Sequence, residues 1–125
     1  MGSKKIVLAI DDNQMQLDMF HKILDSRYDV RTADCASSAM RFLSLNEDKA
    51  DIVLLDITMP HISGFEFLND IKSIPSYLDI PIIIVSGNTG EDFLNEAKNS
   101  SAVDFLAKPV NPEKLIASIE KALKS

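Results

Sequence analysis

The sequence contains too few cysteine and histidine residues for a disulfide framework or a zinc site. Cys35 is the single cysteine of the 125-residue chain, so no internal disulfide can form. His21 and His61 are the two histidines, and together with Cys35 they cannot supply the usual zinc ligands at the usual spacing. A chain without disulfides is typical of a reducing compartment, and we therefore expect a cytoplasmic location.

Long apolar runs are also absent from the sequence. No stretch approaches the roughly 18 apolar residues that a membrane-spanning helix needs, and the start MGSKK lacks the apolar run of a secretory signal. No low-complexity tract and no linker rich in Pro, Gly or Ser divides the chain. The length and the hydrophobic content of 46% predict one domain over residues 4–125, with residues 1–3 as a remnant of cloning.

The sequence has no excess of positive charge. Its formal net charge is -6 at pH 7. Nucleic acids and membrane surfaces are polyanionic and would repel such a chain. We therefore expect no direct binding to nucleic acid or membrane, and a cationic ligand fits the charge better.

The chain alternates between short apolar runs and amphipathic segments. Runs rich in Val, Ile and Leu predict strands at residues 6–10, 28–33, 52–55, 82–85 and 103–107. Apolar residues at helical spacing predict helices at residues 14–25, 36–43, 65–71, 89–98 and from 112 onward. The same spacing places Met15 on the apolar face of the first helix and Ser118 on the polar face of the last. Five alternations of strand and helix indicate an α/β fold in which helices cover both faces of a parallel sheet.

Two of the predicted helices differ in how well the sequence supports them. Asn111 is a natural N-cap and Pro112 suits the first helical position, so the last helix has a clear start. The segment 89–98 has only Phe93, Leu94 and Ala97 as apolar residues. We expect this helix to be held weakly by the rest of the fold.

Charged and polar residues stand where the predicted strands end. The run IVLLDITMP ends its apolar part on Asp56, and the other strand ends carry Asp11, Asp12, Ser86 and Lys108. Right-handed crossovers place all these ends at one edge of a parallel sheet. Two carboxylates 4 Å apart repel each other by about 4 kcal/mol at an effective dielectric constant near 20, so a cluster of three needs a cation.

Each of these residues also has a simpler interpretation. Asp11 or Asp12 alone is most often the N-cap of the following helix, and Asp56 alone could simply close its strand. Ser86 and Lys108 alone would be a loop hydroxyl and a solvated charge. Only the combination of all five points to a reaction site.

The combination suits phosphoryl transfer. Mg²⁺ binds carboxylate oxygens and is commonly completed by phosphate oxygens. Lys108 and the Ser86 hydroxyl can each interact with a phosphoryl oxygen. One carboxylate, which would be Asp56, remains free to act as the nucleophile.

At this point the sequence resembles the receiver domains of two-component response regulators, of the chemotaxis-regulator type, from Lys4 to Ser125. The motifs that carry the resemblance are the pair Asp11 and Asp12, LLDITMP, Gly64, IIIVSGN and DFLAKP. The resemblance implies a flavodoxin-like, doubly wound sheet of five parallel strands in the order 2-1-3-4-5, with five helices.

The resemblance also implies a role for each site residue. Asp56 would be the phosphoacceptor, and Ser86 and Lys108 would contact its phosphoryl group. Mg²⁺ would be held by Asp11, Asp12, Asp56 and the backbone carbonyl of Thr58. Ser86 and Phe105 would form the switch, in which the ring turns inward as Ser86 moves; the alternative for Phe105 is a plain strand side chain that packs on the last helix.

The implied function is a phosphorylation-activated signalling switch. A histidine kinase or a phosphotransfer protein would donate the phosphoryl group, and a downstream output domain or protein would read the change of the signalling face. The domain would assist its own phosphorylation and dephosphorylation without turning over a substrate as an enzyme does. The alternatives are a receiver-like scaffold that signals without phosphorylation, an aspartyl-phosphate phosphatase and a flavin-binding module.

Overall fold

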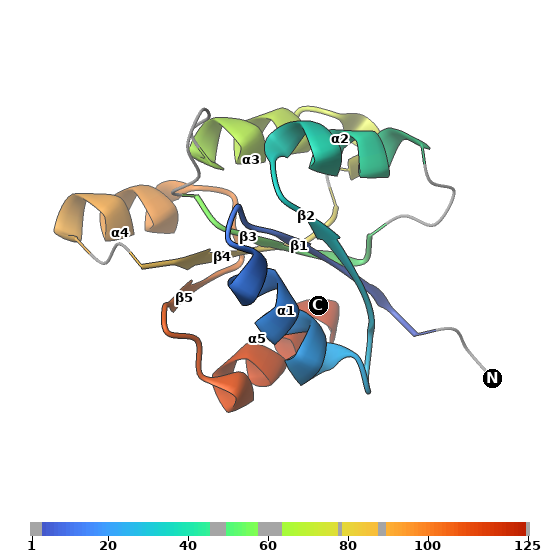
Figure 1. Ribbon diagram of the computed structural model, residues 1–125. Helices are drawn as coiled ribbons and strands as arrows, with labels where there is room; N and C mark the ends of the chain where they lie inside the picture. Colours follow the sequence, from blue (N-terminus) through green and yellow to red (C-terminus); the bar gives the residue numbers. More distant parts are fainter. Residues whose placement is uncertain (1–3, 46–49, 58–63, 78, 88–89, 125) are drawn as a thin grey trace.

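The computed structural model describes residues 4–45, 50–57, 64–77, 79–87 and 90–124. A five-stranded parallel sheet in the order β2-β1-β3-β4-β5 forms its centre, which confirms the predicted topology (Figure 1). The strands are β1 Ile6–Ile10, β2 Asp29–Ala33, β3 Ile52–Leu55, β4 Ile82–Ser86 and β5 Asp104–Ala107.

Helices cover both faces of this sheet. They are α1 Gln14–Leu24, α2 Ala36–Leu45, α3 Gly64–Lys72, α4 Glu91–Asn99 and α5 Pro112–Lys124. In Figure 1, α1 and α5 lie on one side of the sheet, α2 and α3 lie on the other, and α4 lies near β4 and β5. A short 3-10 helix, η1 Pro75–Tyr77, precedes β4 and was not predicted.

Alternate residues of the central strands supply two separate cores. From β1, Leu8 and Ile10 pack with α2 and α3, whereas Val7 and Ala9 pack with α1 and α5. Every residue of β1, β3 and β4 is buried, as expected for parallel strands that are covered on both faces. Each large apolar side chain buried in this way stabilises the fold by about 1.5–3 kcal/mol.

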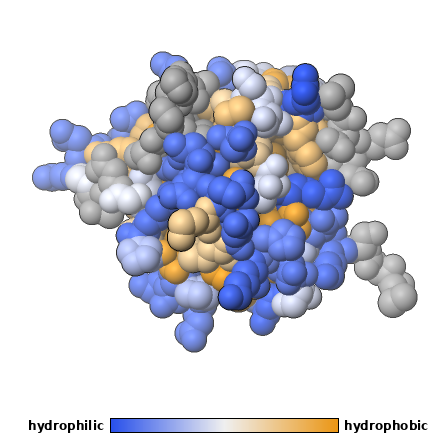
Figure 2. Space-filling view, viewed as in Figure 1, coloured by the Kyte–Doolittle hydropathy of each residue, from blue (hydrophilic) through white to orange (hydrophobic). Residues whose placement is uncertain are grey.

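The surface is largely hydrophilic on the face that Figure 2 presents, where hydrophobic side chains emerge only in small separate areas. Within the part of the chain that is described, no helix has both the length and the apolar character to span a bilayer.

Asparagine side chains start the first and last helices. Asn13 Oδ1 accepts hydrogen bonds from the backbone amides of Met15 and Gln16, at 2.9 and 3.3 Å. Asn111 caps α5 in the same way, as predicted. The simpler interpretation of Asp11 or Asp12 as the cap of α1 is therefore wrong, because Asn13 occupies that position.

The helical patterns misplace three side chains. Met15, on the predicted apolar face of the first helix, is 81% exposed, although Leu17 in the same turn is buried. Leu94 of α4 is 40% exposed, so the apolar face of this helix is thinner than predicted. Ser118, predicted on the polar face of α5, is buried because its hydroxyl donates a hydrogen bond to Asp104 at 2.5 Å.

Candidate functional site

The carboxyl ends of the strands bring the predicted site residues to one edge of the sheet. Asp11 follows β1 and Asp56 follows β3, and the register pairs Ile10 with Leu55 just before them. The Asp56 amide donates to the carbonyl of Ile10 at 2.9 Å, so the ladder itself positions this residue. The register of neighbouring parallel strands therefore fixes two carboxylates side by side.

Asp11, Asp12 and Asp56 form a cluster of three carboxylates. Each offers an oxygen, and these oxygens lie within 4.8 Å of one another. Asp11 and Asp56 are buried, whereas Asp12 is exposed. The cluster is thus a buried pair of acids with a third acid at its solvent side.

Lys108 supplies positive charge to this cluster. Its Nζ donates to Asp11 Oδ2 at 2.8 Å and to Asp56 Oδ2 at 3.4 Å. The side chain of Lys108 is 22% exposed, against 1% for Asp11 and 4% for Asp56. The peptide bond between Lys108 and Pro109 is cis. The simpler interpretation of Lys108 as a solvated surface charge is therefore wrong.

Burial and charge both act on the protonation of these groups. Burial, with a smaller contribution from the charge of Asp56, raises the pKa of Asp11 above its ordinary value of 3.8, against the hydrogen bonds from Lys108 and the Asn13 amide. Burial alone would lower the pKa of Lys108, but its bonds to the two carboxylates outweigh this and raise it above 10.5. Lys108 is accordingly a cation at neutral pH.

Asn13 is a site residue that the sequence reasoning missed. Its backbone amide donates to Asp11 Oδ1 at 3.0 Å, while its side chain caps α1. Asp11 therefore has one oxygen held by the Asn13 amide and the other by Lys108. An asparagine between the acid pair and an amphipathic run is a sequence signal for such a cap.

The set of donors at this edge suits a hard divalent cation. Three carboxylates face one ammonium group, which leaves an excess of negative charge. All three offer oxygen atoms, the ligand type that Mg²⁺ prefers, and exposed Asp12 leaves room for the waters that Mg²⁺ retains. Thr58, whose carbonyl was predicted as a further ligand, lies outside the described residues.

Ser86 lies on β4, the strand next to β3, and Phe105 lies on β5, one strand further toward the edge of the sheet. Ser86 ends β4 and is fully buried, and its carbonyl accepts from the Lys108 amide at 2.9 Å. Phe105 is half-buried and packs on Phe93 of α4, in the core that faces α2 and α3. The alternative that Phe105 packs on the last helix is therefore wrong, since α5 covers the opposite face of the sheet.

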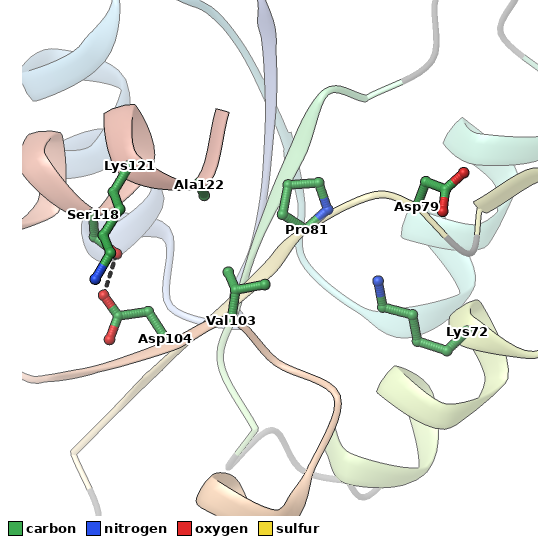
Figure 3. A pocket seen from close by; sticks show the side chains of 8 residues that line it. All are labelled: Lys72, Asp79, Pro81, Val103, Asp104, Ser118, Lys121 and Ala122. Atoms are coloured by element: carbon green, nitrogen blue, oxygen red, sulfur yellow. Dashed lines mark hydrogen bonds between the residues drawn. The ribbon is translucent and has the colours of Figure 1, made fainter. Parts of the chain in front are cut away.

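A cavity of about 440 Å³ at the other end of the sheet lacks the features of a reaction site (Figure 3). Two of the charged side chains that line it already have hydrogen-bond partners within the protein. Asp104 accepts from Ser118, and Lys72 Nζ donates to the carbonyl of Ile80 at 2.5 Å. Burial lowers the pKa of Lys72. The residues that line this cavity nevertheless include no cluster of acids like the one formed by Asp11, Asp12 and Asp56.

Comparison with known proteins identifies the family. The response regulator receiver domain family matches residues 7–120. The 3',5'-cyclic-nucleotide phosphodiesterase regA of Dictyostelium discoideum is 32% identical over 98% of this chain, which spans 16% of that protein. The two-component response regulator ORR3 of Oryza sativa is 31% identical over 85% of this chain, which spans 81% of that protein.

Solved structures agree with this result. The chemotaxis protein CheY4 of Vibrio cholerae superimposes with a TM-score of 0.87 and 30% identity, over 97% of this chain and 100% of that one. The chain therefore belongs to the receiver domains of two-component response regulators.

Membership of this family fixes the general function. Receiver domains are phosphorylation-controlled signalling switches rather than enzymes that turn over a substrate, and they bind Mg²⁺ at an acidic pocket. They interact with histidine kinases or phosphotransfer proteins. The phosphatase and flavin-module alternatives are set aside by the family match.

Proposed function

We propose that Asp56 is the phosphoacceptor of this receiver domain, which comprises residues 4–125. The observation that carries the proposal is the position of Asp56, which is 4% exposed, clustered with two other carboxylates and 3.4 Å from the Lys108 ammonium. In the transfer, an Asp56 oxygen forms a bond to phosphorus as the bond from phosphorus to the donor's histidine nitrogen breaks. The leaving imidazole takes up a proton.

The other residues would support this transfer. Asp11, Asp12, Asp56 and the Thr58 carbonyl would hold Mg²⁺, which when bound supplies positive charge to the phosphoryl oxygens. Lys108 is already directed at Asp56 and would turn to a phosphoryl oxygen as the new group arrives. Ser86, at the end of the neighbouring strand, would donate its hydroxyl to another.

Because these residues all belong to the domain, it would assist both its own phosphorylation and its own dephosphorylation. The donor would be a histidine kinase or a phosphotransfer protein in the cytoplasm. A downstream output domain or protein would read the result. The chain spans less than a fifth of the phosphodiesterase relative. The proposed function therefore concerns the receiver domain and not the activity of a larger protein that contains it.

Acetyl phosphate and Mg²⁺ are expected to add one phosphoryl group to this protein, measured as intact mass. Asp56→Asn and an EDTA control are both expected to abolish the gain, because one removes the nucleophile and the other the metal. Asp70 is an exposed aspartate in the last turn of α3, so Asp70→Asn is the matched control and should be phosphorylated normally.

A gain of mass in Asp56→Asn would contradict the assignment of the acceptor. If the wild type gains nothing, titration with beryllofluoride decides between the two remaining cases. Binding would indicate a pocket that requires its own donor, and absence of binding would favour the scaffold that signals without phosphorylation.

Ser86 and Phe105 would form the switch, and α4 is expected to change most. Ala97 is the one buried residue of α4, so few contacts oppose movement of this helix. Amide hydrogen exchange with and without Mg²⁺ and beryllofluoride should therefore differ most within residues 90–99. Equal protection of that segment in both states, with changes elsewhere, would show that another element carries the signal.

A further inference from the structure

Three phenylalanine rings from three different elements form a continuous contact. The ring of Phe93 in α4 lies 5.5 Å from that of Phe65 in α3 and 6.0 Å from that of Phe105 in β5, measured between centroids. The first pair is tilted by 59° and the second meets edge to face at 71°. Both distances and both orientations are favourable for aromatic pairs, which contribute beyond their buried area. We call this set the aromatic bridge.

The bridge begins next to the candidate site. Phe105 pairs with Ile84 in the register of β4 and β5, and two residues further the same register pairs Ala107 with Ser86. Lys108, which contacts both buried carboxylates, follows directly. Any movement of Ser86 or Lys108 toward a phosphoryl group therefore acts on the strand pair that holds Phe105.

The bridge ends at the first turn of α3. Phe65 is the second residue of this helix, the first helix after Asp56 in the chain. All three rings are half-buried against the same core. None of them carries a polar group, so the rings can transmit a change only through packing.

Phe93 is the central contact and also a main attachment of α4. Ala97 is the one buried residue of this helix, and Leu94 is 40% exposed. A cavity of about 270 Å³ is lined by residues of both α4 and β5, among them Leu94 and Phe105. Because α4 has little other packing, Phe93 is one of its few attachments to the core. A shift of α4 therefore changes the contacts of Phe93 with Phe65 and Phe105.

We propose that Phe93 couples the phosphorylation site to α3, by transmitting the position of Phe105 to Phe65 through the aromatic bridge. The proposal rests on the proposed function, because the signal that enters the bridge is the phosphorylation of Asp56. It adds a second receiving element, since α3 as well as α4 then reports the state of the site. Phe93 acts through other residues and is a positioning residue.

Fluorine NMR of protein labelled with 3-fluorophenylalanine tests the coupling. The chain has six phenylalanines, which single Phe→Leu variants assign. With Mg²⁺ and beryllofluoride, the resonances of Phe65, Phe93 and Phe105 should shift together. Phe20, in the core on the opposite face, should stay in place and serves as the internal reference.

The decisive variant is Phe93→Leu, which keeps an apolar side chain but removes the ring. Phe105 should still respond to beryllofluoride, while the shift of Phe65 should fall to less than half its wild-type size. Phe93→Tyr restores an aromatic ring and should restore the Phe65 response. Leu94→Ala is the control from the same helix, because Leu94 has no ring in the bridge, and it should leave the response unchanged.

The outcomes separate this inference from the proposed function. A full Phe65 shift in Phe93→Leu, with beryllofluoride bound, would overturn the coupling and leave Asp56 as the acceptor. Loss of the Phe65 response in both Phe93→Leu and Phe93→Tyr would also overturn the coupling, because an aromatic ring at position 93 would then not be sufficient to transmit the response. No beryllofluoride binding in the wild type would overturn the proposed function and the coupling with it.

Discussion

Replacing Lys108 with methionine is expected to destabilise the metal-free protein by about 3–5 kcal/mol, the usual cost of removing one partner from a buried ion pair. Methionine keeps an unbranched side chain of similar length, so the loss is chiefly that of the ammonium group. Asp11 and Asp56, at 1% and 4% exposure, would then lack the ammonium group that contacts both of them. Urea unfolding in EDTA measures this change.

Mg²⁺ should reverse most of this loss, because it restores positive charge to the same carboxylates. Any ligand that binds only the folded state stabilises it in proportion to the logarithm of its concentration over Kd. The gain in stability on adding Mg²⁺ should therefore be larger in Lys108→Met than in the wild type, where Lys108 competes for Asp11 and Asp56. Equal gains in both proteins would contradict this competition.

The loss should also depend on pH. Burial already raises the pKa of Asp11, and without Lys108 this pKa should rise further because its hydrogen bond no longer lowers it. A carboxyl group with a raised folded pKa binds more protons when folded than when unfolded, so the protein gains stability as the pH falls. The deficit of Lys108→Met should thus be smaller at pH 5 than at pH 7.

Lys114→Met is the matched control for this experiment. Lys114 is exposed on α5 and its substitution removes the same charge. Its effect should stay within about 0.5 kcal/mol, as is usual for surface positions. A similar loss in both variants would indicate a general charge effect and would contradict the buried ion pair.

The strands were predictable because the sequence pattern and the environment agree. Runs such as Ile52–Leu55 are apolar throughout and are buried throughout, so each position gives the same signal. The caps of α1 and α5 also follow from local chemistry, and Asn111 was identified in advance. Asn13 was missed because two aspartates before it offered equally good capping side chains.

The side chains at element ends were less predictable because tertiary contacts decide them. Met15 fits the helical periodicity of α1, yet it is 81% exposed while Leu17 in the same turn is buried. Ser118 was placed on the polar face of α5, and only its hydrogen bond to Asp104, fourteen residues away in the chain, explains its burial. Periodicity carries no information about such partners.

The candidate site was predictable as a set of residues but not as a geometry. The rule that parallel strands present their carboxyl ends at one edge was sufficient to group Asp11, Asp56 and Lys108. It did not specify that Lys108 contacts Asp11 more closely than Asp56, at 2.8 against 3.4 Å. A long flexible side chain can reach either acid, and only the surrounding packing selects one. The aromatic bridge could not be predicted for the same reason.

Asp12→Ala is expected to weaken Mg²⁺ binding at least about tenfold, equivalent to 1.4 kcal/mol, while slightly stabilising the metal-free protein. The variant removes one of the three carboxylates that would hold the metal, namely the one at the solvent side of the cluster. Because Asp12 is exposed, water screens its repulsion with Asp11 and Asp56, so the gain in metal-free stability should not exceed about 1 kcal/mol.

The structure removes an ambiguity from this experiment. If Asp12 capped α1, its loss would destabilise the helix and hide the relief of repulsion. Asn13 holds both cap hydrogen bonds, so the two effects are separate. Urea unfolding in EDTA then measures the repulsion alone, and calorimetric titration measures Mg²⁺ binding.

Asp70→Ala provides the comparison, since it removes an exposed carboxylate in the last turn of α3 and should leave the Kd for Mg²⁺ unchanged. Destabilisation of metal-free Asp12→Ala by more than 1 kcal/mol would contradict the crowded-carboxylate interpretation. Unchanged Mg²⁺ binding in Asp12→Ala would show that Asp12 is not a ligand and would leave Asp11 and Asp56 as the carboxylates that hold the metal. Because these two acids already share Lys108, the metal would then have to compete with its ammonium group for them.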